Sequence, residues 1–382
     1  MQVSAYSIFM AVLWFSIFSA VFLFLMRRDW FIQSFSIWLL VLLVALSVLR
    51  AFIIIELPKT HVINSYITLH YIWILLDFKL FSLFSTDITV LTLIFVVWGV
   101  GSAVSMVLLL RRYIRFKKWV SHMPYIENQE LISKATEICG ADSRIVFRQS
   151  DQIKTPMTTG LFRPVILLPS HFFSYSFQQD ALHHEYSHYK QGDLWVKLVV
   201  NLTCCVLWWN PLAYLLRNYF DRALEIKCDF KVVSKMTDEQ RLSYYNAILE
   251  VFKMAQTEPT YGEGSFAIGF AQAKQNASLI QRFYVGINYD KRKPRRIINF
   301  LLGLALILLF LFSYSFVIQP ASLPNLDPDI HETTSETAYL IDNNDGTYSF
   351  YVDGEYMSDI SEESAIIEPF SELPIIQREE IN

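Results

Sequence analysis

Two histidines separated by three residues stand in the middle of the chain, in the run His184-Glu185-Tyr186-Ser187-His188. Residues i and i+4 of a helix lie on one face, so both imidazoles can bind one zinc ion. Glu185 lies one step round the same helix, where its carboxylate can take a proton from a metal-bound water. The spacing predicts a zinc hydrolase with His184 and His188 as ligands and Glu185 as general base. A helix with two surface histidines is the alternative.

A second pair of helical residues follows about forty positions downstream, at Glu225 and Asp229. A zinc peptidase needs a third protein ligand and leaves the fourth position to water. Glu225 can be that ligand, while Asp229 can accept the remaining ring N–H of a ligand histidine and fix its tautomer. Alone, such a pair usually marks a solvated helix face; its pairing with the histidine motif favours the metal site. Asp193, just past the first helix, is a weaker candidate for the role of Asp229.

The elements that must position these residues can be predicted from the flanking sequence. Residues 128–139 predict a helix that ends at Gly140, and residues 144–147 and 164–168 predict two strands. The apolar stretch over residues 195–216 separates the two motifs, and a full membrane crossing there would put them on opposite sides of the membrane. We therefore predict a broken hairpin or an interfacial helix pair, bent at Pro211, which keeps the ligands together near the membrane surface.

The composition excludes an ordinary soluble protein, because 53% of the 382 residues are hydrophobic and only 18% are charged. Mean hydropathy is +0.32. Four stretches are long and apolar enough to cross about 30 Å of hydrocarbon, namely residues 6–26, 36–55, 90–110 and 297–317. The sequence thus predicts a polytopic α-helical membrane protein.

Basic residues flank these stretches on one side only, if the N-terminus is outside the cell. They cluster at residues 27–28, 111–118 and 291–296, so the positive-inside rule places residues of about 111–296 in the cytoplasm. Residues 319–382 hold 15 acidic residues and one basic residue, a net charge of -14, whereas the preceding residues carry +10. Both termini are then extracytoplasmic, and the acidic C-terminal part faces outward.

The predicted domains follow from this topology: three transmembrane helices over residues 1–118, a cytoplasmic α+β zinc metallopeptidase domain over 119–296, a fourth transmembrane helix over 297–318, and an acidic extracytoplasmic domain over 319–382. In the last, aromatic runs are separated by turn signals at residues 343–346 and 353–354. This pattern predicts a three-stranded meander and a small β-rich tail. Such a tail is either a ligand sensor or an acidic cap. The four cysteines show no metal or disulfide spacing and are interpreted as ordinary small apolar residues.

Several of these segments together closely resemble the BlaR/MecR-type membrane metallopeptidases, the antirepressor proteases of bacterial β-lactam sensing. The similar segments are residues 155–169 (TPMTTGLFRPVILLP), 184–193 (HEYSHYKQGD), 209–212 (WNPL), 225–229 (EIKCD), 269–274 (GFAQAK) and 281–283 (QRF). The resemblance implies a bacterial plasma-membrane protein of gluzincin type, with zinc on His184, His188 and Glu225 and with Glu185 as general base. It also implies that the strand before the zinc helix pairs with an extended substrate, here through Pro164, Val165, Ile166, Leu167 and Leu168.

The resemblance further implies that an external signal activates the protease, which cleaves a cytoplasmic repressor and so derepresses transcription. The tail departs from the β-lactam sensors, because residues 319–382 contain no lysine and hence no Ser-x-x-Lys nucleophile motif. We therefore expect no covalent β-lactam binding. The basic residues at 291–296 are either a site of autocleavage or a positive-inside anchor.

The expected partners are the lipid bilayer and a cytoplasmic repressor protein as substrate, and we also consider a homodimer. Direct nucleic-acid binding is not expected, because the basic residues cluster at membrane flanks. Two other functions stay open: a housekeeping membrane protease for quality control or peptide processing, and a receptor with an inactive protease domain. The complete set of candidate zinc-site residues argues against the second.

Overall fold

The computed structural model describes residues 5–377 except residues 56–59, 66–67, 84–85, 140–143, 154, 171, 175–177, 235, 257–278, 288–294, 321–337, 344–345, 353, 362–369 and 371–372. Gly140, the family-like segment 269–274 and most of the basic run at 291–296 therefore lie outside the described residues. The chain forms two compact units: Met1–Asn64 with Ile72–Gln319, and Ser65–Tyr71 with Pro320–Asn382.

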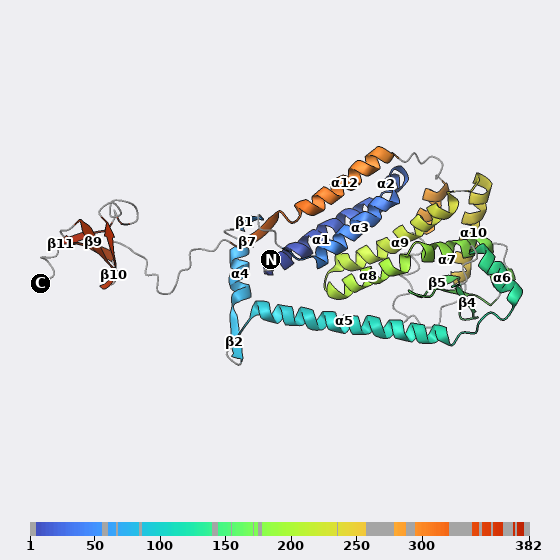
Figure 1. Cartoon of the computed structure of the whole chain (residues 1–382), viewed down its shortest axis with the longest axis horizontal. Coiled ribbons are helices and arrows are strands. Elements are labelled where there is room, and N and C mark those ends of the chain that lie inside the picture. The colour runs from blue at the N-terminus through green and yellow to red at the C-terminus, as the bar shows by residue number, and fades with distance from the viewer. Residues whose placement is uncertain are drawn as a thin grey trace. The chain divides into compact units, whose positions relative to one another are not determined.

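Helices occupy all four predicted apolar stretches: α1 (Ala5–Met26), α3 (Ile37–Phe52), α5 (Val90–Ser121) and α12 (Arg296–Phe312) (Figure 1). Two of the described helices, α1 and α5, are long and apolar enough to cross a membrane. The other two are shorter apolar helices, of 16 and 17 residues. Helix α5 runs on through the basic cluster at 111–118, because nothing in that stretch breaks a helix.

The hairpin predicted between the two motifs is present as α8 (Asp193–Val206) and α9 (Pro211–Val233). The break lies at residues 207–210, where the Asn210 side chain accepts from the backbone N–H of Leu212 and Pro211 takes the first helical position.

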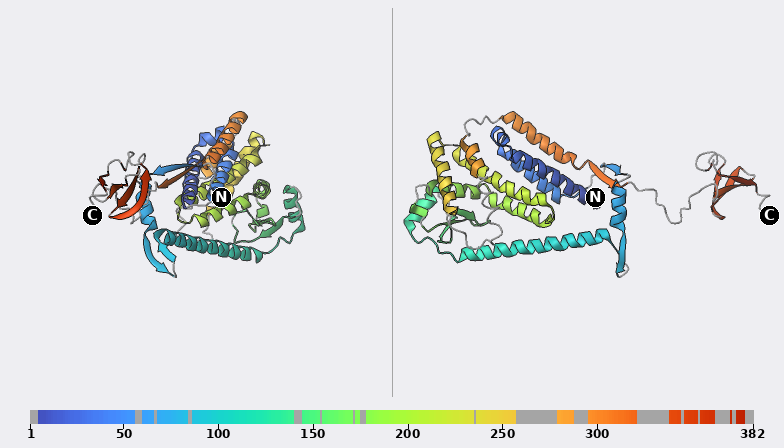
Figure 2. Two further views of the ribbon diagram at one scale, coloured as in Figure 1. Left: turned by 60° about the vertical axis from the view of Figure 1, so that its left-hand side comes forward. Right: turned by 180° about the vertical axis from the view of Figure 1, so that it is seen from behind.

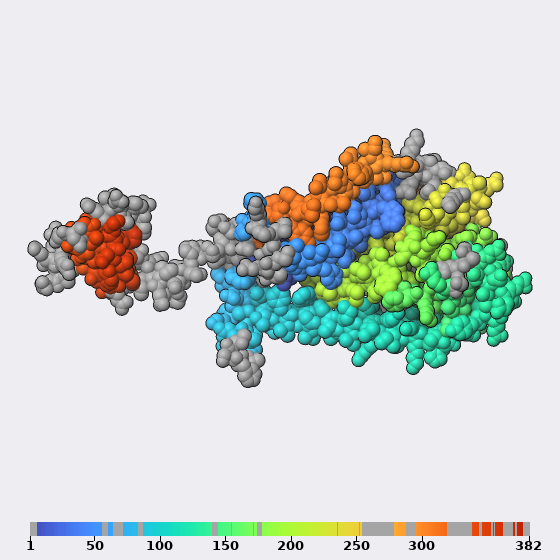
Figure 3. Space-filling view, viewed as in Figure 1, coloured from blue at the N-terminus to red at the C-terminus, as the bar shows by residue number. Residues whose placement is uncertain are grey.

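Helix α9 packs against α1 and α3 as well as α8, and the views of Figure 2 show it running alongside these apolar helices. Its side chains Leu216, Phe220 and Leu224 belong to the same buried cluster as Phe22 of α1 and Leu40 of α3. In the space-filling view the bands of α12, of α1 with α3, of α8 with α9, and of α5 adjoin one another (Figure 3).

The remaining elements around the site are α6 (Gln129–Ile138), α7 (Gln178–Lys190), α10 (Asp238–Gln256), a helix over residues 279–287, and a three-stranded sheet. The sheet has the order β4 (Val146–Gln149), β6 (Val165–Leu168), β5 (Met157–Thr159). Strand β6 pairs in parallel with β4 and antiparallel with β5. A short helical turn, η1 (Phe172–Ser174), leads from β6 towards α7.

The prediction that Pro164, Val165, Ile166, Leu167 and Leu168 pair with substrate is wrong. Both sides of β6 are occupied by neighbouring strands, and the side chains of Ile166, Leu167 and Leu168 are buried. A substrate strand needs an unpaired edge. The strand that lies at the edge beside α7 is β5, which the sequence analysis did not identify.

Short elements complete the first unit: α2 (Asp29–Ser34), β1 (His61–Ser65), α4 (Thr68–Asp77), β2 (Lys79–Leu83), β3 (Thr86–Thr89) and β7 (Phe316–Pro320), of which β1, α4 and β7 each share residues with the second. Strand β1 pairs with β7, and β2 pairs with β3.

The second unit contains the predicted meander, formed by β8 (Ala338–Asp342), β9 (Thr347–Val352) and β10 (Glu355–Ser361) in antiparallel order. Gly346 and Gly354 take positive φ at the two turns, as the turn signals predicted. An unpredicted fourth strand, β11 (Ile375–Gln377), adds in parallel to β8. A small core of Ala338, Leu340, Val352 and Leu373 lies against this sheet.

Candidate metal site

Helices α7 and α9 bring the two histidines and Glu225 together. The Nε2 atoms of His184 and His188 are 3.2 Å apart. Glu225 reaches both, with Oε2 at 3.3 Å from Nε2 of His184 and Oε1 at 3.4 Å from Nε2 of His188. Ligand atoms held about 2.0–2.1 Å from a tetrahedral zinc ion are about 3.3 Å from one another. Glu225 uses a different carboxylate oxygen for each imidazole, and the three side chains lie close enough together to share one metal ion.

The other ring nitrogen of His188 is held by Asp193, the residue that the sequence made the weaker candidate. The Nδ1 atom lies 2.8 Å from Oδ2 of Asp193, and the second oxygen of that carboxylate pairs with the buried ammonium of Lys227. Gly192, at φ +71°, lets the chain turn sharply from α7 into α8 and so puts Asp193 back against His188. A proton on Nδ1 leaves the Nε2 lone pair directed at the site.

His184 has a corresponding set of partners from α9 and α10. Its Nδ1 atom is 2.8 Å from the Tyr244 hydroxyl and 3.3 Å from Oδ1 of Asp229. The hydroxyl in turn donates to Asp229 at 2.8 Å. His184 is therefore the donor at Nδ1, and its Nε2 faces Glu225 and His188. Asp229 lies where the sequence predicted an acceptor, but Tyr244 makes the shorter contact with the ring.

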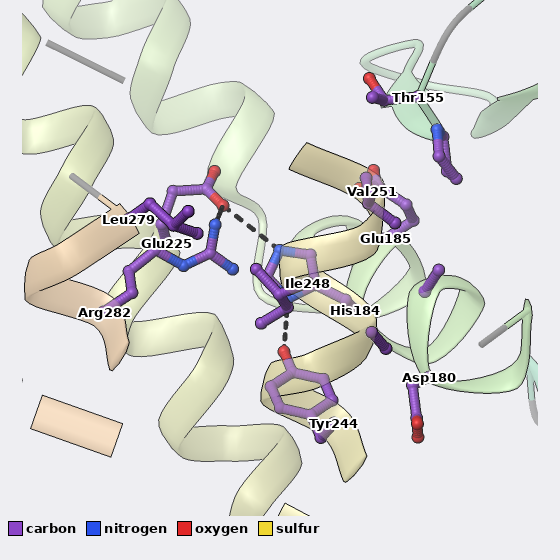
Figure 4. Close-up of a pocket in the computed structure, with 13 residues that line it drawn as sticks. Thr155, Asp180, His184, Glu185, Glu225, Tyr244, Ile248, Val251, Leu279 and Arg282 are labelled. Carbon is purple, nitrogen blue, oxygen red and sulfur yellow. Dashed lines mark hydrogen bonds and ion pairs between the residues drawn. The ribbon is translucent and has the colours of Figure 1, made fainter. Parts of the chain in front are cut away.

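Arg282, on the helix over residues 279–287, joins two carboxylates of α9, those of Glu225 and Asp229. It donates through Nε and Nη2 to the two oxygens of Asp229 at 2.7 and 2.8 Å. Its Nη1 lies 3.2 Å from Oε2 of Glu225, and Figure 4 shows this pair. Burial raises the pKa of the Asp229 carboxyl, but the Arg282 guanidinium outweighs it and lowers that pKa to about 2. Asp229 is therefore ionised at neutral pH.

The proposed general base, Glu185, lines a pocket together with His184, Glu225 and Arg282, and it accepts hydrogen bonds from the three-stranded sheet. The Thr158 hydroxyl of β5 lies 2.9 Å from Oε2 of Glu185 and 2.8 Å from its carbonyl oxygen. This contact ties the edge strand to the carboxylate that would handle the proton. Residues of α7, α9, α10 and the helix over 279–287 line this pocket, and they include the apolar side chains of Ala247, Ile248, Val251 and Leu279.

Cys228 also lies at the site, which its interpretation as an ordinary apolar residue missed. Its thiol donates to the carbonyl oxygen of His184 at 3.3 Å, and its sulfur is within 4.8 Å of donor nitrogens of both histidines. Burial raises the pKa of this thiol, while the nearby His184 outweighs it and lowers that pKa to about 7. His184, His188 and Cys228 thus form a second donor set beside the one that contains Glu225.

Three residues at the site had no part in the sequence-based assignment: Thr158, Tyr244 and Arg282. Arg282 stood in a segment noted for its family resemblance, without a role. Tyr244 lies in an amphipathic helix where a tyrosine has no distinctive spacing, and Thr158 belongs to a strand of three residues. No local pattern connects any of the three with the histidine motif.

Two imidazoles and a carboxylate that converge beside a second glutamate define the arrangement of a metallopeptidase site. The family model described as BlaR1 peptidase M56 matches residues 3–283. The chain therefore belongs to the BlaR1 peptidase M56 family, and the family resemblance noted in the sequence is confirmed.

Curated relatives are bacterial and carry regulatory or resistance names. The chain is 27% identical to the regulatory protein BlaR1 of Bacillus licheniformis, over 55% of this chain and 36% of the relative. It is 20% identical to the regulatory protein BlaR1 of Staphylococcus aureus, over 66% of this chain and 45% of the relative. It is 24% identical to the methicillin resistance mecR1 protein of Staphylococcus epidermidis, over 40% of this chain and 26% of the relative. The matches span less than half the length of each relative.

Proposed function

We propose that the chain is a membrane-bound zinc endopeptidase with His184, His188 and Glu225 as the metal ligands. The observation that carries the proposal is the convergence of three side chains. The two Nε2 atoms lie 3.2 Å apart, and the two oxygens of the Glu225 carboxylate lie 3.3 and 3.4 Å from them, separations that suit ligands of one metal ion. The hydrogen bonds at the two Nδ1 atoms support it as well, because they hold both rings with their Nε2 atoms only 3.2 Å apart. Cys228 is the weaker third ligand, since its thiol is bonded to a backbone carbonyl.

A zinc ion bound here would polarise a scissile carbonyl and make a bound water acidic. The chain's own residues then account for the rest of the chemistry. Glu185 holds the proton taken from the attacking water and passes it to the leaving amine. Thr158 keeps that carboxylate in place, and Asp193 and Asp229 hold the two imidazoles in the tautomer that leaves Nε2 unprotonated.

We assign the substrate backbone to the unpaired edge of β5 rather than to β6. Among the described residues no strand pairs with the outer side of β5, and Thr158 connects this strand to Glu185. An extended peptide that adds there passes beside the general base. The apolar wall formed by Ala247, Ile248, Val251 and Leu279 would accept a side chain of that peptide.

The proposal includes the topology derived from the sequence: helices over 1–118 and 297–318 in the membrane, the peptidase domain of 119–296 in the cytoplasm, and residues 319–382 outside. Contacts of the α8–α9 turn support a site at the membrane. Trp98 and Ser102, in the middle of the apolar part of α5, donate to the carbonyl oxygen of Val206 at 2.7 and 3.2 Å, and Asn210 bonds Ser16 in the middle of α1 at 3.2 Å. These contacts support a hairpin whose tip, at residues 206–210, enters the membrane while the rest of the peptidase domain stays in the cytoplasm.

We further propose that the peptidase transduces an external signal by cleaving a cytoplasmic repressor. The regulatory names of the relatives support this role, and the separate outer β unit offers a place for signal recognition. Housekeeping proteolysis with the same site is the second candidate, and a winged-helix repressor gene next to this gene would favour signalling over it.

The test of the proposed function is Glu185→Gln in the full-length protein. Because glutamine cannot accept the proton, we expect zinc to stay bound at one equivalent while cleavage of a fluorogenic peptide library falls by at least about 100-fold. Zinc is counted by metal analysis after gel filtration. Undiminished proteolysis by this variant, or a wild-type protein without zinc affinity, would contradict the proposal.

A further inference from the structure

The helix over residues 279–287 supplies a cation that contacts two carboxylates of α9, those of Glu225 and Asp229. Arg282 donates two hydrogen bonds to Asp229, and its Nη1 lies 3.2 Å from the Glu225 carboxylate. Two carboxylates one turn apart repel each other when both are buried and ionised. Arg282 lies closer to the Glu225 carboxylate than Lys197, which is 4.0 Å from its other oxygen, so the position of Arg282 bears on the orientation in which Glu225 contacts both imidazoles.

The neighbouring residue fastens the same helix to the end of α1. The Gln281 amide nitrogen donates to the carbonyl oxygen of Met26 at 3.0 Å and to Oδ1 of Asp29 at 2.8 Å. Met26 is the last residue of α1, and Asp29 is the first of α2. Val285, one turn further along the helix, is buried in the cluster formed by α1, α3 and α9. One short helix thus contacts both the metal site and the end of an apolar helix.

The two histidines differ in how their supporting cations are carried. Lys227, which pairs with Asp193, is on α9 itself and moves with Glu225. Arg282 is on a separate helix, whose place relative to α9 is set by its own contacts, those of Gln281 among them. A shift at the end of α1 would move Arg282 through Gln281, the residue next to it. The pair of Lys227 and Asp193 lies entirely within the α8–α9 hairpin.

We propose that Gln281 and Arg282 are positioning residues that couple the end of α1 to the metal ligand Glu225. This inference rests on the proposed function, because it needs a metal at His184, His188 and Glu225. Displacement of the α1–α2 corner, residues 26–29, moves Gln281 with it and moves Arg282 away from Glu225. Glu225 then loses the orientation in which it contacts both imidazoles. Return of the corner restores the ligand set. The helix over 279–287 is then the place where movement of an apolar helix changes metal affinity.

The experiment measures zinc affinity of the full-length protein in lipid nanodiscs by competition with a chelator. We expect Arg282→Lys to weaken binding about 10- to 100-fold, because a point charge cannot replace the planar fork. Gln281→Ala should weaken it by roughly tenfold through the loss of two hydrogen bonds. In an Arg282→Ala background, Gln281→Ala should cause no further loss, since Gln281 acts through Arg282.

Asp29 gives an independent pair of variants that leaves the helix itself intact. Asp29→Ala removes the acceptor and should weaken zinc binding, while Asp29→Asn keeps an oxygen for the Gln281 amide and should restore affinity. Tyr219→Phe is the matched control, because it removes a contact of 3.1 Å between Arg27 of the same corner and α9 without involving the helix. It should leave affinity unchanged.

Equal losses from Gln281→Ala with and without Arg282, no loss at all, or equal affinities of Asp29→Ala and Asp29→Asn would overturn the coupling. These outcomes are distinct from failure of the proposed function, which would appear first as a wild-type protein that binds no zinc.

Discussion

At the scale of single residues, each histidine of the site is supported by a carboxylate and each carboxylate by a cation. His188 contacts Asp193, which pairs with Lys227. His184 contacts Asp229, which pairs with Arg282. A buried carboxylate without a partner would be costly to keep ionised, and a carboxylate that gained a proton could no longer fix the imidazole tautomer. The paired cations therefore keep both imidazoles ready for a metal. The Tyr244 hydroxyl adds a further hydrogen-bond link between His184 and Asp229.

The choice between Glu225 and Cys228 as third ligand can be tested at this scale. We expect Glu225→Ala to weaken zinc binding by more than the roughly 10- to 100-fold that loss of a supporting residue causes. Cys228→Ser, which keeps a donor for the carbonyl of His184, should leave affinity nearly unchanged. Chelator competition on both variants gives the answer, and the opposite order of effects would make Cys228 the ligand.

At the scale of elements, the helix over residues 279–287 is packed too tightly against α10 to tolerate a side chain at Gly286. A Cβ built there would lie 1.9 Å from the ring of Tyr245, which is itself fully buried. The neighbouring Phe283 packs on the same ring, with centroids 5.4 Å apart. This close approach sets the distance between the helix over 279–287 and α10, and hence the position of Arg282.

We therefore expect Gly286→Ala to lower the free energy of unfolding by about 1–3 kcal/mol through overpacking, despite the better helix propensity of alanine. Gly99→Ala in α5 is the matched control, because a Cβ there meets nothing within 4 Å. Thermal unfolding of both variants in the same detergent measures the difference. Equal stabilities would show that Tyr245 moves aside without cost.

At the scale of the whole molecule, the helix that carries Glu225 and Asp229 is also the helix that packs on α1 and α3. The apolar side of α9 shares one core with Phe22 and Leu40, while its Glu225 and Asp229 contact the histidines of α7. Metal site and apolar helices are therefore parts of one packed unit rather than two domains joined by a linker. This arrangement suits a peptidase whose activity depends on the state of its membrane helices.

The proposed topology predicts the location of reporters fused at two points. A reporter after Ser121, the end of α5, should be cytoplasmic, and one after Asn382 should be extracytoplasmic, because the basic clusters lie on the inner side. An alkaline phosphatase and a fluorescent protein at each point distinguish the two sides. Phosphatase activity at Ser121 or fluorescence at Asn382 would reverse the topology.

The sequence by itself determined what helical periodicity can determine. The spacing of His184 and His188, and of Glu225 and Asp229, puts each pair on one face of its own helix, and the break at Pro211 and the meander of the tail follow from local turn chemistry. Only the tertiary structure decided which elements meet. Thr158, Tyr244 and Arg282 reach the site from a short strand and two other helices, and β6 is an inner strand because β4 and β5 pair on both its sides. Such contacts depend on side-chain packing between segments far apart in the chain, which no local pattern encodes.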